Sequence, residues 1–346
     1  MPGKSSGSLV SIQLLRAIAA IVVVFGHAQT EAFQANGAFS PTRFDFGIGV
    51  DVFFIVSGFV MVISSAKLIG TAGAAGTFIR KRLWRVVPLY WFYTCGMLLA
   101  IAIFPSALNN AAASLPMVIS SFLFLPFPNA NGEYLPVLAL GWTLNYEMFF
   151  YALFAIALLR RNARWLEVVW LLIMAAMILG AALPGTAFGF WGNPIIAEFL
   201  IGVLLAKLWQ HSPGQRSAAM FALCLLTAAV LYVVLSPIEG LRLVSHGIPS
   251  AVFSVGLIFF LPLRLEQVGE GFARVVGDSS YSLYLSHPFV LAILRMVWGK
   301  FDPDFAQPWT YVLVATAACV VAGYASYILI EKPAIRLARR PAALPA

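Results

Sequence analysis

The feature that most constrains the fold of this chain is a series of apolar stretches, each long enough to cross a lipid bilayer. A membrane-spanning helix needs about 17–25 mostly apolar residues, because the hydrocarbon core is about 30 Å thick and a helix rises about 1.5 Å per residue. Ten stretches meet this requirement, at residues 9–28, 47–66, 86–104, 141–159, 165–183, 192–209, 218–235, 247–263, 282–299 and 310–330. The sequence therefore predicts an all-α, polytopic membrane protein with about ten transmembrane helices.

The amino-acid composition indicates that lipid, rather than water, surrounds most of the chain. Of the 346 residues, 61% are hydrophobic and 10% are charged, whereas about a quarter of the residues of a soluble protein are charged. The cysteines lie in apolar stretches and form no CxxC pair, so we expect neither a disulfide framework nor a bound metal. We expect residues 1–346 to form a single transmembrane domain with no soluble domain.

The lysines and arginines predict how the helices are oriented. Most of them lie in alternate loops, and only Arg43, Arg242 and Lys300 lie in the loops between. Because basic loops are retained in the cytoplasm, ten spans with both termini cytoplasmic fit best, in the inner (plasma) membrane. The net charge of +8 then reports topology rather than a nucleic-acid partner. Residues 116–127 are too short to span, so we expect a re-entrant or interfacial segment there.

The first apolar stretch carries two ionisable residues, Arg16 and His27, eleven positions apart. At about 100° per residue they return to nearly the same helix face, roughly 16 Å apart along the axis. A charge at membrane depth costs at least about 2.5–3.5 kcal/mol, so Arg16 needs either an ion-pair partner or a polar cavity. His27, at the outer end, is either a hydrogen-bonded structural histidine or a base that takes a proton from a hydroxyl.

Two carboxylates are expected near the same outer end. Asp51 begins the second stretch, and it is either a helix cap or a partner of Arg16 or His27. Glu147 lies about 9 Å into the fourth stretch if that helix starts near residue 141. It either orients His27 and relays protons, or it neutralises Arg16.

A basic cluster, Arg80-Lys81-Arg82-Leu83-Trp84-Arg85, directly precedes the third stretch on the cytoplasmic side. One interpretation is a topology signal that also binds anionic lipid headgroups. The other is a clamp for a polyphosphate, since four cations suit phosphates and the tryptophan suits a stacked base. The cluster alone does not decide between them.

The start of the ninth stretch is unusually polar. Hydroxyl side chains, Tyr281, Tyr284 and His287 enter the membrane there from the cytoplasmic side. Polar groups at that depth imply a cavity. Two other histidines, His211 and His246, lie in predicted loops without an evident partner, and we expect them to be solvated.

Five motifs, taken as a set, resemble one family. They are Arg16-x10-His27, Phe54-x-x-Ser57-Gly58-Phe59, Lys81-Arg82-x-x-Arg85, Trp142-Thr143-Leu144 with Glu147, and Ser280-Tyr281-Ser282-Leu283-Tyr284-Leu285-x-His287. In this order they resemble the acyltransferase 3 family of integral membrane acyltransferases, in its stand-alone branch linked to exopolysaccharide decoration. The resemblance covers essentially the whole chain. Lys81 stands where an arginine is commoner, and a lysine offers charge without a bidentate fork.

The resemblance implies transfer of an acyl group, usually acetyl from acetyl-CoA, to a hydroxyl of an extracytoplasmic glycan such as an exopolysaccharide or its lipid-linked precursor. Together with the residue pattern it predicts catalytic roles for Arg16, His27, Asp51 and Glu147. The residues predicted to bind the donor or substrate are Ser57, Arg80, Lys81, Arg82, Arg85, Trp142, Tyr281, Tyr284 and His287.

The resulting hypothesis has a direction across the membrane. The donor binds its phosphates at the basic cluster, its pantetheine arm passes Tyr284, His287 and Arg16, and His27 acts as general base on the acceptor hydroxyl, with an acidic residue orienting its ring. In a competing route His27 is a nucleophile that carries the acyl group. A proton-coupled transporter or glycan flippase also fits intramembrane ionisable residues, and a scaffold of a polysaccharide-export complex is a third class.

Overall fold

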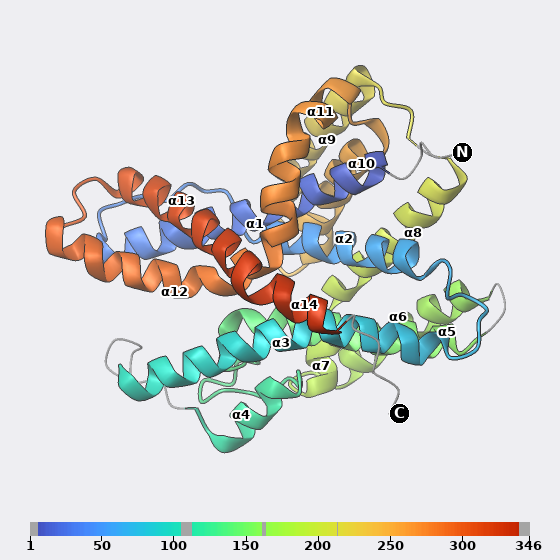
Figure 1. Ribbon diagram of the computed structural model, residues 1–346, viewed down its shortest axis with the longest axis horizontal. Coiled ribbons are helices and arrows are strands. Elements are labelled where there is room, and N and C mark those ends of the chain that lie inside the picture. The colour runs from blue at the N-terminus through green and yellow to red at the C-terminus, as the bar shows by residue number, and fades with distance from the viewer. Residues whose placement is uncertain (1–5, 105–112, 161–163, 213, 339–346) are drawn as a thin grey trace, which may run out of the picture. The chain divides into compact units, whose positions relative to one another are not determined.

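The computed structural model describes residues 6–104, 113–160, 164–212 and 214–338. These residues form helices joined by turns and loops, with no β-strand among them (Figure 1). The predicted all-α class is therefore confirmed. The two chain ends, which the charge pattern predicts to be cytoplasmic, lie outside the described residues.

Fourteen α-helices are described over these ranges. In chain order they are α1 (Ser6–Ala35), α2 (Ile48–Ser65), α3 (Ala74–Ile103), α4 (Leu115–Phe122), α5 (Trp142–Leu158), α6 (Trp165–Ala182), α7 (Ala187–Trp191), α8 (Ala197–His211), α9 (Ala218–Leu235), α10 (Ile248–Phe260), α11 (Leu263–Phe272), α12 (Asp278–Phe301), α13 (Pro308–Ser326) and α14 (Lys332–Ala338). Short π-helical segments lead into α10, α12 and α14, at Leu243–Gly247, Ala273–Gly277 and Tyr327–Glu331. Such segments are rare and are frequent at functional sites.

Within the described residues, eight helical segments are long and apolar enough to cross a membrane. They contain α1, α2, α3, α6, α8, α9, α10 and α13, which shows a polytopic membrane protein. Two predicted spans are helices outside this set: α5 has 17 residues, and α12 has 24 residues with several polar side chains. The count of ten spans stays a prediction. As expected for a segment too short to span, α4 has only eight residues.

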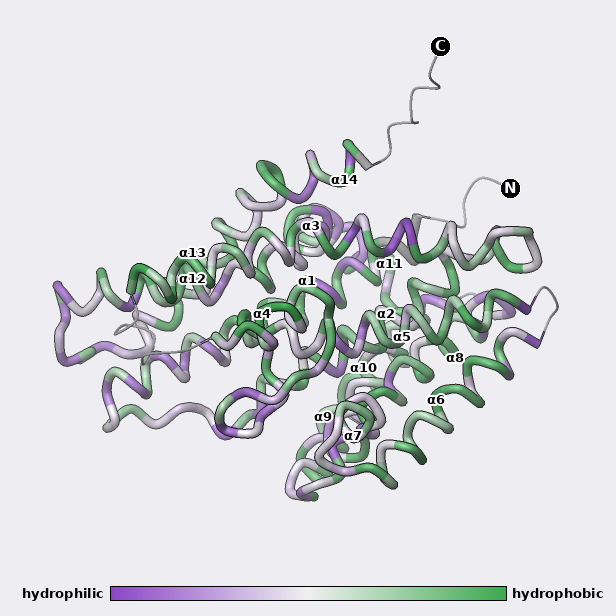
Figure 2. The backbone as a smooth tube through the Cα atoms, turned by 90° about the horizontal axis from the view of Figure 1, so that it is seen from below, coloured by the Kyte–Doolittle hydropathy of each residue, from purple (hydrophilic) through white to green (hydrophobic). Residues whose placement is uncertain are grey.

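Large apolar side chains are exposed along several of these helices. Examples are Leu171 and Ile178 on α6, Val233 on α9 and Val321 on α13. Figure 2 shows long hydrophobic stretches along α6 and α8. Monomeric soluble proteins rarely expose contiguous apolar surface, whereas lipid tails are as apolar as leucine. These surfaces are therefore suited to face the bilayer.

The described helices cluster into two compact units. Unit 1 is built from residues 1–60 and 201–329, and unit 2 from residues 61–200 and 330–346. Unit 1 thus holds α1, most of α2 and α8, and the helices from α9 to α13. Unit 2 holds the helices from α3 to α7 and α14.

In unit 1, α1 is the central helix. It contacts α10, α11, α12 and α13, and α12 lies alongside α13. Small residues at intervals of three, eight and four line one face of α1 and are fully buried: Ala17, Ala20, Ala28 and Ala32. Without a hydrophobic driving force between membrane helices, small residues allow the close approach that holds them together.

The closest approach in unit 1 joins α1 to the start of α12. A Cβ atom placed on Gly277 would lie only 2.4 Å from the backbone oxygen of Gln13. Only glycine permits this approach, because any larger residue would overlap the backbone of α1. The contact brings Asp278, the first residue of α12, beside the polar part of α1.

In unit 2, α3 packs against α5, and α5 packs against α6. A Cβ atom placed on Gly141 would lie 2.6 Å from the hydroxyl of Tyr90, so α5 begins beside the middle of α3. Along the N-terminal half of α3, Phe78 contacts the rings of Tyr151 and Phe154. Residues in the second half of α5 therefore lie opposite the basic half of α3.

Candidate active site

His27 of α1 contacts His287 of α12. Nδ1 of His27 lies 2.7 Å from Nε2 of His287, and the two rings are nearly parallel, with an interplanar angle of 14°. His287 is fully buried, whereas His27 is exposed. Nδ1 of His287 lies 3.3 Å from the backbone oxygen of Leu283. Sequence reasoning placed His287 with the donor and missed this contact, because the pairing of two distant helices cannot be read from either one.

Arg16 is connected to α12 through the side chain of Gln13. Its Nη1 donates to Oε1 of Gln13 at 3.2 Å, and Nε2 of Gln13 donates to Oδ1 of Asp278 at 2.5 Å. Gln13 thus connects the guanidinium of Arg16 to a carboxylate that is 265 positions away from Gln13. A signal for Gln13 was present in the sequence, since it is a polar residue three positions before Arg16 in an apolar stretch.

A third contact joins α1 to α12 beyond the histidine pair. Arg295 of α12 and Glu31 of α1 form an ion pair with a nitrogen–oxygen distance of 3.0 Å. Arg16 and His27, which the sequence places on nearly the same helix face, therefore both lie on the side of α1 that faces α12. The structure agrees with the helical spacing of Arg16 and His27, and it adds the partner helix.

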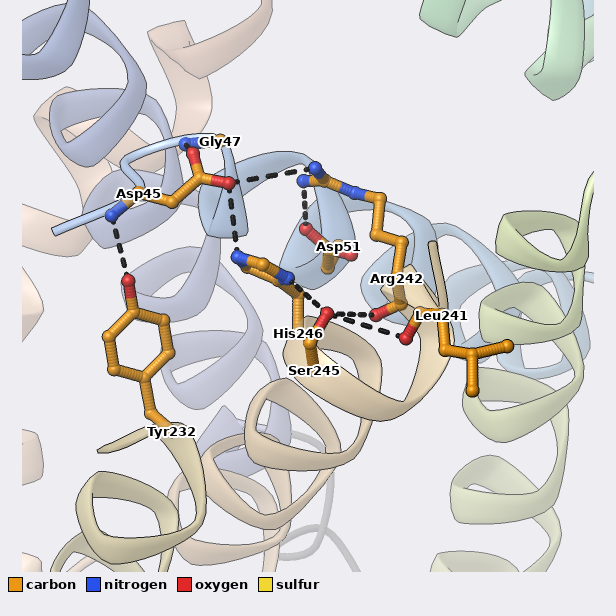
Figure 3. A network of polar contacts seen from close by, with 8 residues as sticks. All are labelled: Asp45, Gly47, Asp51, Tyr232, Leu241, Arg242, Ser245 and His246. Carbon is orange, nitrogen blue, oxygen red and sulfur yellow. Dashed lines mark hydrogen bonds and ion pairs between the residues drawn. The ribbon is translucent and has the colours of Figure 1, made fainter. Parts of the chain in front are cut away.

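Asp51 has a different partner from those expected. Its carboxylate is fully buried and forms an ion pair with Arg242, with 2.6 Å between Oδ2 and Nη2 (Figure 3). The expectation that Asp51 pairs with Arg16 or orients His27 is therefore wrong. Arg242 was visible in the sequence as one of the few arginines in the loops opposite the basic ones, and a buried carboxylate needs such a cation.

Asp45 extends this network towards the surface (Figure 3). Its Oδ2 lies 3.0 Å from Nε2 of His246 and 3.7 Å from Nη1 of Arg242, and its Oδ1 accepts from the backbone N–H of Gly47. The hydrogen bond with His246, then that with Gly47 and the charge of Arg242, lowers the pKa of Asp45 to about 2, although partial burial opposes this shift. Asp45 is therefore a permanent anion near neutral pH.

The prediction of a solvated histidine is wrong for His246. This residue is buried in the π-helical segment before α10, and its Nδ1 lies 2.8 Å from the hydroxyl of Ser245. The ring of His246 points towards Asp45, whereas the hydroxyl of Ser245 donates back to backbone oxygens three and four residues before it (Figure 3). His211 is exposed as predicted, and its Nδ1 lies 2.8 Å from the backbone oxygen of Lys207.

This network lies close to the end of α1 that carries His27. Phe46, the residue after Asp45, packs directly on Gly26, where a Cβ atom would come within 2.3 Å of the Cβ of Phe46. Its ring also contacts that of Phe25, with 5.4 Å between centroids. The network of Asp45, Asp51, Arg242 and His246, which we call the loop clamp, therefore holds the connection between α1 and α2 beside His27.

In unit 2, Arg82 and Glu147 belong to one internal network. The hydroxyl of Tyr151 donates to the Glu147 carboxylate, and the Arg82 guanidinium lies over the Tyr151 ring, 5.7 Å from its centroid. Arg82 also donates to the hydroxyl of Ser64. Glu147 therefore lies opposite the basic half of α3. Its expected partnership with His27 stays a prediction.

The basic cluster divides into two groups. It lies inside α3, which begins at Ala74, rather than before the helix. Arg82 is buried, whereas Arg80, Lys81 and Arg85 are exposed together with Trp84. At about 100° per residue the exposed side chains share one face of the helix. A polyphosphate clamp of four cations is therefore reduced to three.

The remaining predicted binding residues lie in both units. In unit 1, the buried Tyr284 contacts the rings of Phe53 and His287, whereas Ser57 and Tyr281 are half-buried. In unit 2, Trp142 is half-buried at the start of α5. Among the described residues, no group of three or more histidine, cysteine or acidic side chains could hold a metal ion.

Comparison with known proteins adds family information to this geometry. The family model described as acyltransferase domain, of the acyltransferase 3 type, matches residues 9–330. The chain is 33% identical over 303 residues to the exopolysaccharide production protein ExoZ of Rhizobium meliloti (strain 1021), covering 84% of this chain and 90% of that protein.

Two more distant relatives cover most of the chain. The acyltransferase MdmB of Streptomyces mycarofaciens is 24% identical over 381 residues, covering 97% of this chain and 94% of that protein. The putative peptidoglycan O-acetyltransferase YrhL of Bacillus subtilis (strain 168) is 25% identical over 370 residues, covering 92% of this chain and 54% of that protein. No solved structure matches the chain.

Proposed function

The chain belongs to the acyltransferase 3 family, and we propose that it transfers acetyl from acetyl-CoA to a hydroxyl of an extracytoplasmic glycan. The acceptor is an exopolysaccharide or its lipid-linked precursor, and the protein lies in the inner (plasma) membrane. One observation carries the proposal: an exposed histidine, His27, is backed by a fully buried histidine, His287, on a membrane helix. The names of the relatives, an exopolysaccharide production protein and a putative peptidoglycan O-acetyltransferase, support a glycan acceptor.

In the proposed reaction His27 is the general base. It takes the proton of the acceptor hydroxyl while the hydroxyl oxygen attacks the thioester carbonyl carbon. The new carbon–oxygen ester bond forms, the carbon–sulfur bond breaks, and the thiolate leaves. The proton then passes from His27 to the sulfur, so the products are the acylated glycan and free CoA, and His27 returns to its starting state.

Exposed and partly buried cations suit different parts of the donor. Exposed Arg80, Lys81 and Arg85 suit the phosphates of acetyl-CoA, and Trp84 on the same helix face suits its adenine ring. Arg16, directed by Gln13, suits the thioester carbonyl or the oxyanion that develops from it.

A second chemical route uses the same residue. His27 attacks the thioester carbonyl carbon, the carbon–sulfur bond breaks, and the CoA thiolate leaves an acyl-imidazole behind. The acyl-imidazole then passes the acyl group to the acceptor hydroxyl, whose proton goes to the thiolate. Incubation of the purified protein with radiolabelled acetyl-CoA alone separates the two routes. Label trapped on His27 supports the acyl-histidine route, and its absence in a preparation that transfers label once acceptor is added supports direct transfer.

The proposed substrate class is tested by the glycan itself. Extracellular polysaccharide from cells with the chain, without it, and with His27→Gln would be compared by proton NMR. We expect O-acetyl signals only with the unaltered chain, at equal protein abundance in the membrane. An identical glycan in all three strains would sink the exopolysaccharide proposal, and O-acetyl signals retained by the His27→Gln strain would argue for a scaffold role.

A further inference from the structure

The hydrogen-bond partners of the histidine pair determine where its protons lie. The backbone oxygen of Leu283, 3.3 Å from Nδ1 of His287, can only accept a hydrogen bond. Nδ1 of His287 must therefore carry a proton. His287 is fully buried, and an imidazolium without a counter-charge is costly there, so its other nitrogen, Nε2, is unprotonated and acts as an acceptor.

The same reasoning then applies to His27. Its Nδ1 lies 2.7 Å from Nε2 of His287, and this acceptor requires a donor. Nδ1 of His27 must therefore carry the proton, which leaves Nε2 of the neutral ring with its lone pair. The hydrogen bonds thus run from His27 through His287 to the carbonyl of Leu283, with His287 accepting at Nε2 and donating at Nδ1.

We infer that His287 is a positioning residue, which holds His27 in the tautomer whose Nε2 is the base for the acceptor hydroxyl. This inference rests on the proposed function for its catalytic meaning. It gives His287 the place behind His27 where the sequence led us to expect an acidic residue; one candidate for that place, Asp51, is paired with Arg242. The basic histidine is thus positioned by a second histidine, whereas in acyl-transfer triads it is positioned by a carboxylate.

A neutral partner has a consequence for the reaction. When Nε2 of His27 takes the acceptor proton, the ring becomes an imidazolium whose Nδ1–H still donates to His287. Because that partner is an uncharged imidazole, it stabilises the cation by a hydrogen bond without an ion pair. The imidazolium therefore forms less readily than beside a carboxylate, and it returns its proton to the leaving sulfur more readily.

Two substitutions at position 287 separate this role from simple packing. The amide oxygen of glutamine can take the place of Nε2 and accept from Nδ1 of His27, whereas asparagine is too short and reaches only the position of Nδ1. We expect His287→Gln to keep kcat within about tenfold of the unaltered protein. We expect His287→Asn to lose about 10²–10⁴-fold in kcat, with KM for the acyl donor unchanged. Equal losses in the two variants, or a change confined to KM, would overturn the inference.

A direct measurement makes the inference independent of activity. Nitrogen-15 NMR of the full chain, labelled at histidine and reconstituted in lipid, distinguishes protonated from unprotonated ring nitrogens, and the His27→Gln variant identifies the signals of His27. We expect His27 with Nδ1 protonated and Nε2 bare, and loss of this preference in His287→Asn. The Nε2–H tautomer in a protein that transfers acyl groups overturns the inference and leaves the function standing. The expected tautomer in a protein without transferase activity keeps the inferred proton positions and overturns the proposed function.

Discussion

Gln13 links the Arg16 guanidinium to the carboxylate of Asp278, so a neutral side chain sets the direction of the Arg16 cation. A hydrogen bond to a charged group is worth about 1.5–3 kcal/mol. If Arg16 contacts the donor, Gln13 matters for donor binding although it touches no substrate. This role follows from the contacts with α12, which no property of the first apolar stretch alone reveals.

Replacing Gln13 tests this role. Gln13→Met keeps the length of the side chain and removes both hydrogen bonds, and we expect the KM for acetyl-CoA to rise about tenfold, with a smaller change in kcat. Steady-state kinetics of the purified protein measure both constants. Gln34→Met is the matched control, since Gln34 is an exposed residue of the same helix, and it should leave both constants unchanged. A Gln13→Met variant with unaltered KM contradicts the role.

At the scale of single residues, the sequence predicted which residues belong to the candidate site better than it predicted which residues they contact. Arg16 and His27 were found because ionisable residues in an apolar helix are costly and because their spacing has a helical period. The partners His287, Gln13 and Arg242 come from contacts between helices that are distant in sequence. Periodicity gives the face of one helix and says nothing about which helix covers it, so Asp51 was assigned to the wrong cation.

The loop clamp is an element in its own right, because it ties the connection between α1 and α2 to the start of α10. Its energetic centre is the fully buried carboxylate of Asp51 and its ion pair with Arg242. Removing one member of a buried pair typically costs about 3–5 kcal/mol, because the other charge remains buried and uncompensated. The Arg242 side chain is 34% exposed, so we place the cost at the low end of this range.

A pair of substitutions in the loop clamp tests this cost. Arg242→Met should lower the free energy of unfolding by about 3 kcal/mol, measured as denaturant or thermal unfolding in detergent. Arg43→Met is the matched control, because Arg43 is an exposed arginine of the connection between α1 and α2, and it should change stability by less than about 0.5 kcal/mol. Similar effects of both substitutions would show that the buried ion pair does not stabilise the loop clamp.

The pKa of Asp45 predicts how the loop clamp responds to acid. Its pKa is lowered from the ordinary value of 3.8 to about 2 by His246, Gly47 and Arg242. A carboxyl with a lowered pKa stabilises the fold at pH above its unfolded value, and this contribution is lost as the pH falls towards the folded value. The thermal midpoint of the unaltered protein should therefore exceed that of Asp45→Asn at pH 6. The difference should shrink from about pH 5 to about pH 3, and a constant difference over this range contradicts the prediction.

At the scale of the whole molecule, the membrane class was the most predictable property. Apolar length depends only on composition along the chain, so eight of the predicted spans recur as helices long enough to cross. Helix ends were less predictable. Because the polar cluster at residues 80–85 has good helix formers, α3 begins at Ala74, twelve residues before the predicted span. The basic cluster is therefore part of the helix, and its cations point to different sides.

Whether α5 and α12, the two predicted spans outside the group of eight, cross the membrane determines the topology. If α5 and α12 both cross, Asn131 and Asp304 lie outside the cytoplasm, and Leu159 and Glu270 lie inside. Asn131, Leu159 and Asp304 are exposed and Glu270 is half-buried. Single cysteines at these positions, in a variant without the three native cysteines, would be probed in intact cells with a thiol reagent that cannot cross the membrane. We expect labelling at 131 and 304 only. Labelling of 159 or 270 would contradict the predicted ten spans.

The central claim is that this chain moves an acyl group from a thioester to a hydroxyl through His27. Purified protein in lipid vesicles would be given radiolabelled acetyl-CoA and deacetylated exopolysaccharide, and label in the polysaccharide would be measured for the unaltered protein and for His27→Gln. We predict transfer by the unaltered protein and a rate lower by about 10²–10⁴-fold or more for His27→Gln. Equal rates for both proteins, or label that never leaves acetyl-CoA, would contradict the claim.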